Sequence, residues 1–188
     1  ETLASMGDDT PMHVLSNHVR SIYDYFRQQF AQVTNPPIDP LRENIVMSLE
    51  TCLGPERNLF EESAHHADRL TVSSPTLSED KFNTILTLGD EDDQYKHTII
   101  DITYEDGNDL SAEIDRITSE AVDAVSNGTV ILVLSDRNVS ETRVPASALL
   151  ATGATHHALI NAGLRCDANL IVETGSARDS HHIAVLIG

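Results

Sequence analysis

Residues 129–134 read Thr-Val-Ile-Leu-Val-Leu, six apolar or β-branched residues in a row with no polar alternation. Such a run is typical of a strand that is covered on both faces of a parallel sheet. A helix is predicted just before it, because apolar residues recur there at three- and four-residue spacing: Leu110, Ile114, Ile117, Ala121 and Val125. Asn127-Gly128 then supplies the left-handed residue that usually ends a helix.

Strands and helices alternate in the same way on both sides of this segment. Residues 98–102 (Thr-Ile-Ile-Asp-Ile) and 170–172 (Leu-Ile-Val) are predicted strands. The first of them joins residues 129–134 through a right-handed crossover. The remaining predicted elements are a helix from Pro145 to about residue 162, a short helix at 177–181 and a last strand at 183–187. This order predicts an α/β fold with a mainly parallel sheet and alternating helices.

The part before residue 98 is predicted to be helical and loop-rich. An amphipathic helix is expected to end before Pro36, because five apolar residues share one face: Val19, Tyr23, Phe26, Phe30 and Val33. Pro40 is expected to begin a short helical turn that continues over 41–48, and another helix is expected near 79–88. The polar residues 61–79 and the acidic residues 89–97 are interpreted as surface connections.

Acidic residues dominate the charge of the chain. Thirty Asp and Glu face twelve Lys and Arg, which gives a formal net charge of −18 over 188 residues. This balance argues against binding to nucleic acid or to anionic membranes, both of which attract Lys and Arg. We interpret the acidic residues as a solvated surface. The excess of acidic residues also fits the hypothesis that the protein is adapted to high salt. The length predicts one domain over residues 1–188, and no apolar run is long enough to cross a bilayer.

Motifs for phosphate, metal or covalent chemistry are missing or weak. The sequence has neither the GxxxxGK[ST] loop nor GxGxxG after a strand. Histidine pairs at 65–66, 156–157 and 181–182 are interpreted as hydrogen-bonded within the fold, because adjacent residues on a helix diverge by about 100°. Asp8-Asp9 is interpreted as a loop that caps backbone amides rather than as a magnesium site. No catalytic, cofactor-binding or metal-binding residue is therefore assigned.

The residues after the 129–134 strand occupy the position where sites of α/β proteins often gather. Ser135 and Asp136 lie there, but no GxSxG motif surrounds Ser135. Arg137 and Arg143 are expected either to bind an anion or to pair with the acidic surface, and the excess of acid favours pairing. Cys52 and Cys166 are interpreted as reduced, packed thiols of a reducing compartment, so a cytoplasmic protein is expected.

Several specific stretches occur in order along nearly the whole chain. Among them are Ser-Met-Gly-Asp-Asp-Thr-Pro at 5–11, Gln-Val-Thr-Asn-Pro-Pro-Ile-Asp-Pro at 32–40, Leu-Gly-Pro-Glu at 53–56, Val-Leu-Ser-Asp at 133–136 and His-His-Ile-Ala-Val-Leu-Ile-Gly at 181–188. As an ordered set they resemble the central domain of the glutamate synthase large subunit, whereas residues 61–130 match it only loosely. The resemblance implies that the chain is most of that central domain.

The resemblance also implies a role. In that family the large subunit carries a glutaminase domain and a domain with FMN and an iron–sulfur cluster, so these cofactors are expected outside this chain and none within it. The central domain supplies part of the wall of an ammonia tunnel. By motif position, Met6 and Thr34 look like tunnel-lining residues. The implied function is a noncatalytic scaffold and tunnel wall in glutamate biosynthesis, and the implied partners are the neighbouring glutaminase and FMN-binding domains.

Two other functions stay open at this point. One is a freestanding α/β domain that binds a small ligand, which tight binding of a metabolite by the isolated chain would indicate. The other is an enzyme in its own right, although no residue pattern predicts its reaction. Whether the chain by itself catalyses anything is therefore left undecided by the sequence.

Overall fold

The computed structural model describes residues 17, 19–26 and 39–188. By its internal contacts the chain divides into two compact units. The larger unit comprises residues 49–178, and the smaller one comprises residues 1–48 together with 179–188. The single domain expected over residues 1–188 stays a prediction.

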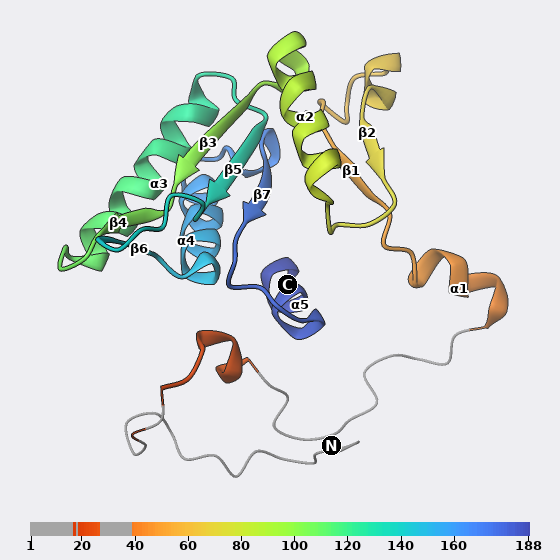
Figure 1. Cartoon of the computed structure of the whole chain (residues 1–188). Coiled ribbons are helices and arrows are strands. Elements are labelled where there is room, and N and C mark those ends of the chain that lie inside the picture. Colours follow the sequence, from red (N-terminus) through yellow and green to blue (C-terminus); the bar gives the residue numbers. More distant parts are fainter. Residues whose placement is uncertain (1–16, 18, 27–38) are drawn as a thin grey trace. The chain divides into compact units, whose positions relative to one another are not determined.

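A three-stranded parallel sheet forms the centre of the larger unit (Figure 1). Its strands are β3 (His97–Asp101), β5 (Ile131–Ser135) and β7 (Asn169–Glu173), in the order β3-β5-β7. The crossovers contain α3 (Leu110–Ser126) and α4 (Ala148–Asn161). The predicted α/β fold with a mainly parallel sheet is therefore confirmed, and all five residues of β5 are buried, as the run of apolar residues predicts.

Helices and a hairpin cover the two faces of this sheet. α3 and α4 pack against each other and against the strands on one face. On the other face, Ile131 and Val133 pack against α2 (Glu79–Glu91) and against a hairpin of β1 (Thr51–Leu53) and β2 (Leu70–Val72). Alternate residues of β5 therefore serve two different cores, which explains why none of them is polar before Ser135.

Short elements complete the larger unit. β4 (Thr103–Glu105) pairs antiparallel with β6 (Arg143–Pro145) just beyond the ends of β3 and β5. Three short 3-10 helices lie in its connections: η3 (Ala64–Ala67), η4 (Asp93–Tyr95) and η5 (Arg165–Asp167). The smaller unit contains η2 (Ile22–Tyr25), α1 (Pro40–Val46) and α5 (Ser180–Ile187).

Local chemistry explains where the predicted helices begin and end. The Asp109 carboxylate accepts a hydrogen bond from the Ser111 amide at the start of α3, and Gly128 takes a φ of 87° just after its end. The Asp39 carboxylate accepts from the amides of Leu41 and Arg42, with Pro40 at the first helical position, as expected for α1. These stop and start signals are visible in the sequence, and the structure confirms them.

The end of the chain corrects one prediction. Residues 183–187 are not a strand but belong to helix α5, and of the short helix expected at 177–181 only residues 180 and 181 are helical, as the start of α5. The Asp179 side chain caps α5 by accepting from the His182 amide at 2.9 Å. A short apolar run has no periodicity that separates a strand from a helix, so the cap decides.

Three other predictions also need correction. Pro145 ends β6 instead of beginning α4, and the end of a short strand is a position where proline, which lacks an amide hydrogen, is tolerated. The 61–79 region contains β2, because Leu70 and Val72 pair with Leu53 and Thr51.

The N-terminal amphipathic helix is the third correction. Over residues 19–26 the chain forms only the short η2, in which Tyr23 is buried while Val19 is 98% exposed. A helical pattern needs a surface on which its apolar face can pack, and Val19 is almost wholly exposed. Phe30 and Val33 lie outside the described residues.

Candidate functional site at the carboxyl edge of the sheet

Polar residues end all three parallel strands at the same edge. Asp101 of β3 is the register partner of Ser135 of β5, and Ser135 is the register partner of Glu173 of β7. Because side chains on neighbouring strands in register point to the same face, the three lie in one row. The carboxyl edge of a parallel sheet is the usual place for a site in an α/β protein, so this row is the first place to look for function.

The first group in this row joins β5 to β7. The Ser135 hydroxyl donates to Oε2 of Glu173 at 2.5 Å, and Nε of Arg137 donates to Oε1 of the same carboxylate at 2.6 Å. Nη2 of Arg137 also lies 3.5 Å from Oε1 of Glu79, at the start of α2. The hydrogen bond and charge of Glu173 raise the pKa of Arg137 above its ordinary value. Both oxygens of Glu173 are thus occupied.

The second group surrounds Asp101. Its Oδ1 accepts from both the amide and the hydroxyl of Thr103, each at 2.7 Å, and its Oδ2 accepts from Asn138 at 3.0 Å. Arg143 approaches Oδ2 at 3.3 Å. Partial burial opposes ionisation, but the hydrogen bonds from Thr103 and Asn138 and the charge of Arg143 outweigh it and lower the pKa of Asp101.

Arg143 connects this group to the β4–β6 pair. Its Nε donates to the Thr103 hydroxyl at 3.0 Å, and its Nη2 donates to the Thr103 carbonyl at 2.8 Å. Nη1 pairs with Glu105 at 3.3 Å. Of the two roles considered for Arg137 and Arg143, the structure therefore shows pairing with carboxylates.

A third group ties the loops that follow β5 and β7. Asp136 accepts from the Thr174 hydroxyl at 2.5 Å and from the Gly175 amide at 3.1 Å. The Thr174 hydroxyl in turn lies 2.9 Å from that of Ser176. These contacts hold the two loops side by side, so the whole edge is linked from β3 to β7.

This arrangement is suited to holding loops rather than to bond-making. A nucleophilic serine needs a base that is free to take its proton, whereas the acceptor of the Ser135 proton is also bound by Arg137. The carboxylates of Asp101 and Asp136 are likewise bound by hydroxyl, amide or guanidinium donors. We therefore describe the edge as a clamp, meaning the linked groups of Asp101, Ser135, Asp136, Arg137, Arg143 and Glu173.

At least one histidine of each pair has a hydrogen-bond partner within its own unit. His65 Nδ1 lies 2.8 Å from Asp68, and His66 Nε2 lies 2.7 Å from the Glu61 carbonyl. His156 Nδ1 accepts from Nε of Arg165 at 2.9 Å. In the smaller unit, His181 bonds the Tyr23 carbonyl at 3.0 Å, and His182 stacks on the Tyr23 ring. The interpretation of these histidines as hydrogen-bonded within the fold is confirmed for the bonds named.

The remaining candidates are quickly placed. Met6 and Thr34, together with Asp8 and Asp9, lie outside the described residues. Cys52 and Cys166 are free thiols, but both are exposed rather than packed. Cys52 is exposed because it points outward from the middle of β1.

Within residues 17, 19–26 and 39–188, no group of three or more His, Cys, Asp or Glu is arranged to hold a metal ion. No helix in these same ranges is long and apolar enough to span a membrane.

Four of the six clamp residues are candidates in the sequence itself. Ser135, Asp136, Arg137 and Arg143 were noticed because they follow an evident buried strand. Asp101, Glu173 and Thr174 were missed. Asp101 lies within the predicted strand 98–102 but ends the observed strand β3, and Glu173 and Thr174 follow the predicted strand 170–172. The signal that identifies them is the row of polar residues at successive strand ends, and it becomes readable once the strand order is known.

Comparison with known proteins assigns the chain to a family. A family model described as the glutamate synthase central domain matches residues 1–188. Glutamate synthase [NADH] of Schizosaccharomyces pombe is 46% identical over 191 residues, which cover 100% of this chain and 9% of that protein. Ferredoxin-dependent glutamate synthase 2 of Synechocystis is 46% identical over 97% of this chain and 12% of its own length. The large chain of glutamate synthase [NADPH] of Bacillus subtilis is 41% identical over 100% of this chain and 12% of its own length. The chain thus spans about a tenth of these relatives.

Proposed function

The chain belongs to the glutamate synthase central domain family, and we propose that it serves as a noncatalytic scaffold and ammonia-tunnel wall within a longer glutamate synthase chain. In this role it links a glutaminase domain, which releases ammonia from glutamine, to an FMN-binding domain, which uses that ammonia to make glutamate. The observation that carries the proposal is the match over residues 1–188 to a region that is 9–12% of proteins named glutamate synthases.

The clamp supports the noncatalytic part of this proposal. Each carboxylate of the clamp is bound by a donor from a neighbouring strand or loop, so the carboxyl edge of the sheet stabilises loops. A freestanding domain that binds a small ligand is the alternative function, and it would need this edge to be open. A metabolite that raises the unfolding temperature of the isolated chain would favour that alternative.

The cofactors of the longer enzyme are proposed to lie in its other domains. Iron–sulfur clusters are held mainly by several cysteine thiolates, whereas this chain has two cysteines, both exposed, one in β1 and one in η5. The residues present therefore do not fit such a cluster. We place the cluster and the FMN in the neighbouring polypeptide, and we keep the cytoplasm as the proposed compartment, although two relatives of this family are named as chloroplastic.

Met6 and Thr34 are the proposed tunnel-lining residues. Thr34 stands in the segment Val-Thr-Asn-Pro-Pro, in which prolines restrict the backbone, and its hydroxyl is a hydrogen-bond partner for ammonia. Met6 offers a flexible, polarizable side chain that adapts to a passing molecule.

The test is made in the full-length enzyme. Thr34→Trp should separate glutamine hydrolysis from glutamate formation, so that free ammonia accumulates. Glutamate formation from added ammonium should be retained, since the synthase centre is not altered. Thr87→Trp, at an exposed position of α2, is the matched control and should leave the stoichiometry unchanged. An unchanged stoichiometry in Thr34→Trp would refute the tunnel role.

A further inference from the structure

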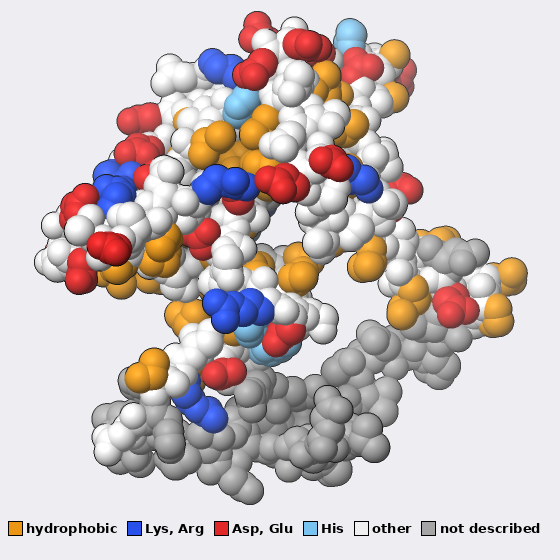
Figure 2. Space-filling model, viewed as in Figure 1, with side chains coloured by type: hydrophobic (Ala, Val, Ile, Leu, Met, Phe, Trp, Pro, Cys, Tyr) orange, Lys and Arg blue, Asp and Glu red, His pale blue; other side chains and the backbone are white. Residues whose placement is uncertain are grey.

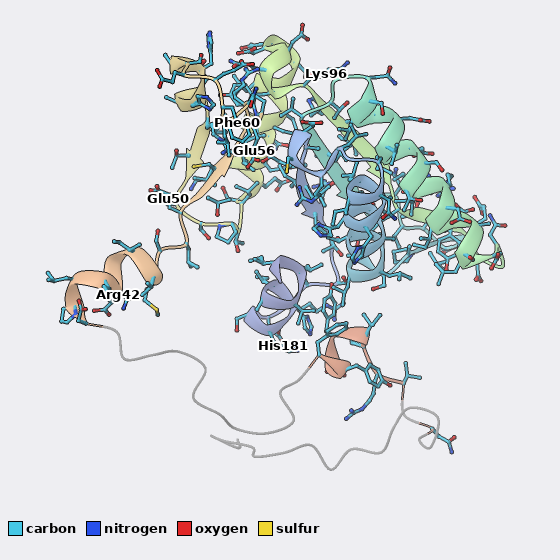
Figure 3. All side chains as sticks on the ribbon, turned by 180° about the vertical axis from the view of Figure 1, so that it is seen from behind. Arg42, Glu50, Glu56, Phe60, Lys96 and His181 are labelled. Atoms are coloured by element: carbon cyan, nitrogen blue, oxygen red, sulfur yellow. The ribbon has the colours of Figure 1, made fainter. Side chains whose placement is uncertain are left out.

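Two large apolar side chains lie almost wholly in solvent at the tip of the connection between β1 and β2. Leu59 is 89% exposed and Phe60 is 98% exposed. Residues 57–61, here called the Phe60 turn, carry them between the two strands of the hairpin (Figure 3). Exposing a Phe ring and a Leu side chain together is unfavourable, and adjacent exposed apolar residues mark surfaces that meet another molecule.

The Phe60 turn is held in shape by its own hydrogen bonds. The Glu61 amide donates to the Asn58 carbonyl at 3.0 Å, and the Phe60 amide donates to the Asn58 side-chain oxygen at 3.1 Å. The Asn58 amide group donates to the Glu61 carboxylate at 3.0 Å. Asn58 therefore fixes both the backbone and the flank of the turn, in the manner of an Asx turn.

Two further bonds anchor the turn to the rest of its unit. Before the tip, Arg57 donates to the Gln94 side chain of η4 at 2.8 Å. After the tip, the Glu61 carbonyl lies 2.7 Å from Nε2 of His66 in η3. A turn that is anchored on both sides presents Leu59 and Phe60 in one orientation, so little conformational entropy is lost when they are bound.

The charge around the tip indicates the chemistry of its partner. Glu56, Glu61 and Glu62 are exposed within a few residues of Phe60, and Arg57 is the one cation among residues 56–62. Acidic side chains are also spread over the visible face of the molecule, whereas Lys and Arg form few, small groups (Figure 2). A pocket that receives Phe60 should therefore be apolar inside and basic at its rim.

We infer that the Phe60 turn docks into an apolar, basic-rimmed pocket on another domain of the same longer chain. This inference rests on the proposed function in one respect only: both require that the chain is part of a longer glutamate synthase chain. The relatives supply the partner, because about nine-tenths of their length lies outside the matching region, which is 9–12% of each. A second copy of this chain is a poor partner, since two bodies that each carry −18 repel one another and offer few basic residues.

The test places a photo-crosslinker at the tip in the full-length enzyme. Benzoylphenylalanine replaces Phe60, and the cross-linked peptide is identified by mass spectrometry. We expect one major cross-link to a site outside residues 1–188, with apolar residues and Lys or Arg nearby. The same probe at Ser119, an exposed position of α3, should give no cross-link of comparable yield. A cross-link to a second copy, a cross-link within residues 1–188, or none at all would overturn the inference.

Hydrogen exchange in the full-length enzyme gives an independent reading. Phe60→Ala should speed amide exchange in residues 57–66 by roughly tenfold or more, because a buried Phe side chain stabilises an interface by at least that factor. Phe60→Leu should restore most of the protection. Equal exchange in all three proteins would contradict docking, whereas it would leave the ammonia-tunnel test with Thr34→Trp unaffected.

Discussion

The clamp at the carboxyl edge of the sheet and the Phe60 turn are both built from side-chain hydrogen bonds. They differ in what they present to solvent: the clamp binds its own polar groups, whereas the turn exposes apolar side chains. In the clamp, the carboxylates of Asp101 and Glu173 are bound by donors of the same unit. In the Phe60 turn, the hydrogen bonds stabilise a backbone whose two apolar side chains contact solvent. The difference separates a region that is complete within this chain from one that needs further polypeptide.

The largest effect tests the core that supports the clamp. Leu132 is fully buried in β5, on the face that α3 and α4 cover. Leu132→Ala should lower the free energy of unfolding by about 2–5 kcal/mol, because it removes buried methyl groups and leaves a cavity. Urea unfolding of the purified chain measures this value. Leu150→Ala in α4, where the side chain is 38% exposed, is the control and should cost clearly less.

A substitution within the clamp itself should have an intermediate effect on stability. Asp101→Asn keeps the size of the side chain but sets an amide donor against the donors of Asn138 and Arg143. Because hydrogen bonds to charged groups contribute most, and the site is half-exposed, a loss of about 1–2 kcal/mol is expected at neutral pH. Asp115→Asn, on the exposed surface of α3, should change stability little. Equal effects of the two substitutions would mean that the clamp does not stabilise the fold.

The carboxylate of Asp101 also makes the contribution of the clamp to folding stability depend on pH. The pKa of Asp101 is lower in the folded chain than its ordinary value, so its contribution is fully present above about pH 4. That contribution is lost as the pH falls through the lower, folded-state pKa. The acid limb of the stability curve should therefore be less steep in Asp101→Asn than in the parent chain, and identical limbs would contradict the assignment.

The residues in these predictions differ in how well the sequence alone predicts their position in the fold. The 129–134 strand and the helix before it were predictable, because a buried strand and an amphipathic helix are each encoded by their own residues. The row of Asp101, Ser135 and Glu173 was not, since it depends on the order β3-β5-β7 and its register. Residues 183–187 were misassigned, because the cap at Asp179 outweighs a preference for strand in a short apolar run. The Phe60 turn was missed because side-chain exposure is a property of the fold.

A smaller effect arises at the other end of the sheet unit, where His156 meets Arg165. Partial burial, followed by the charges of Arg165 and His157, lowers the pKa of His156. Its Nδ1 accepts a hydrogen bond from Arg165 and so must carry no proton. The folded chain therefore binds fewer protons than the unfolded chain, and stability should fall as the pH drops below about 6.5. His156→Gln and Arg165→Met should each reduce this slope between neutral and mildly acid pH, as measured by unfolding at a series of pH values.

The smallest effect is the sharpest test of the difference between the two regions. In the isolated chain, Phe60→Ala removes a side chain that is 98% exposed, so the free energy of unfolding should stay within about 0.5 kcal/mol of the parent value. In the full-length enzyme, the same substitution should loosen residues 57–66, as measured by hydrogen exchange. A residue that matters only in the longer chain is positioned for contact with that chain and not for folding of its own unit. If Phe60→Ala instead destabilised the isolated chain as strongly as Asp101→Asn does, the turn would belong to this unit's own core, and the contrast with the clamp would disappear.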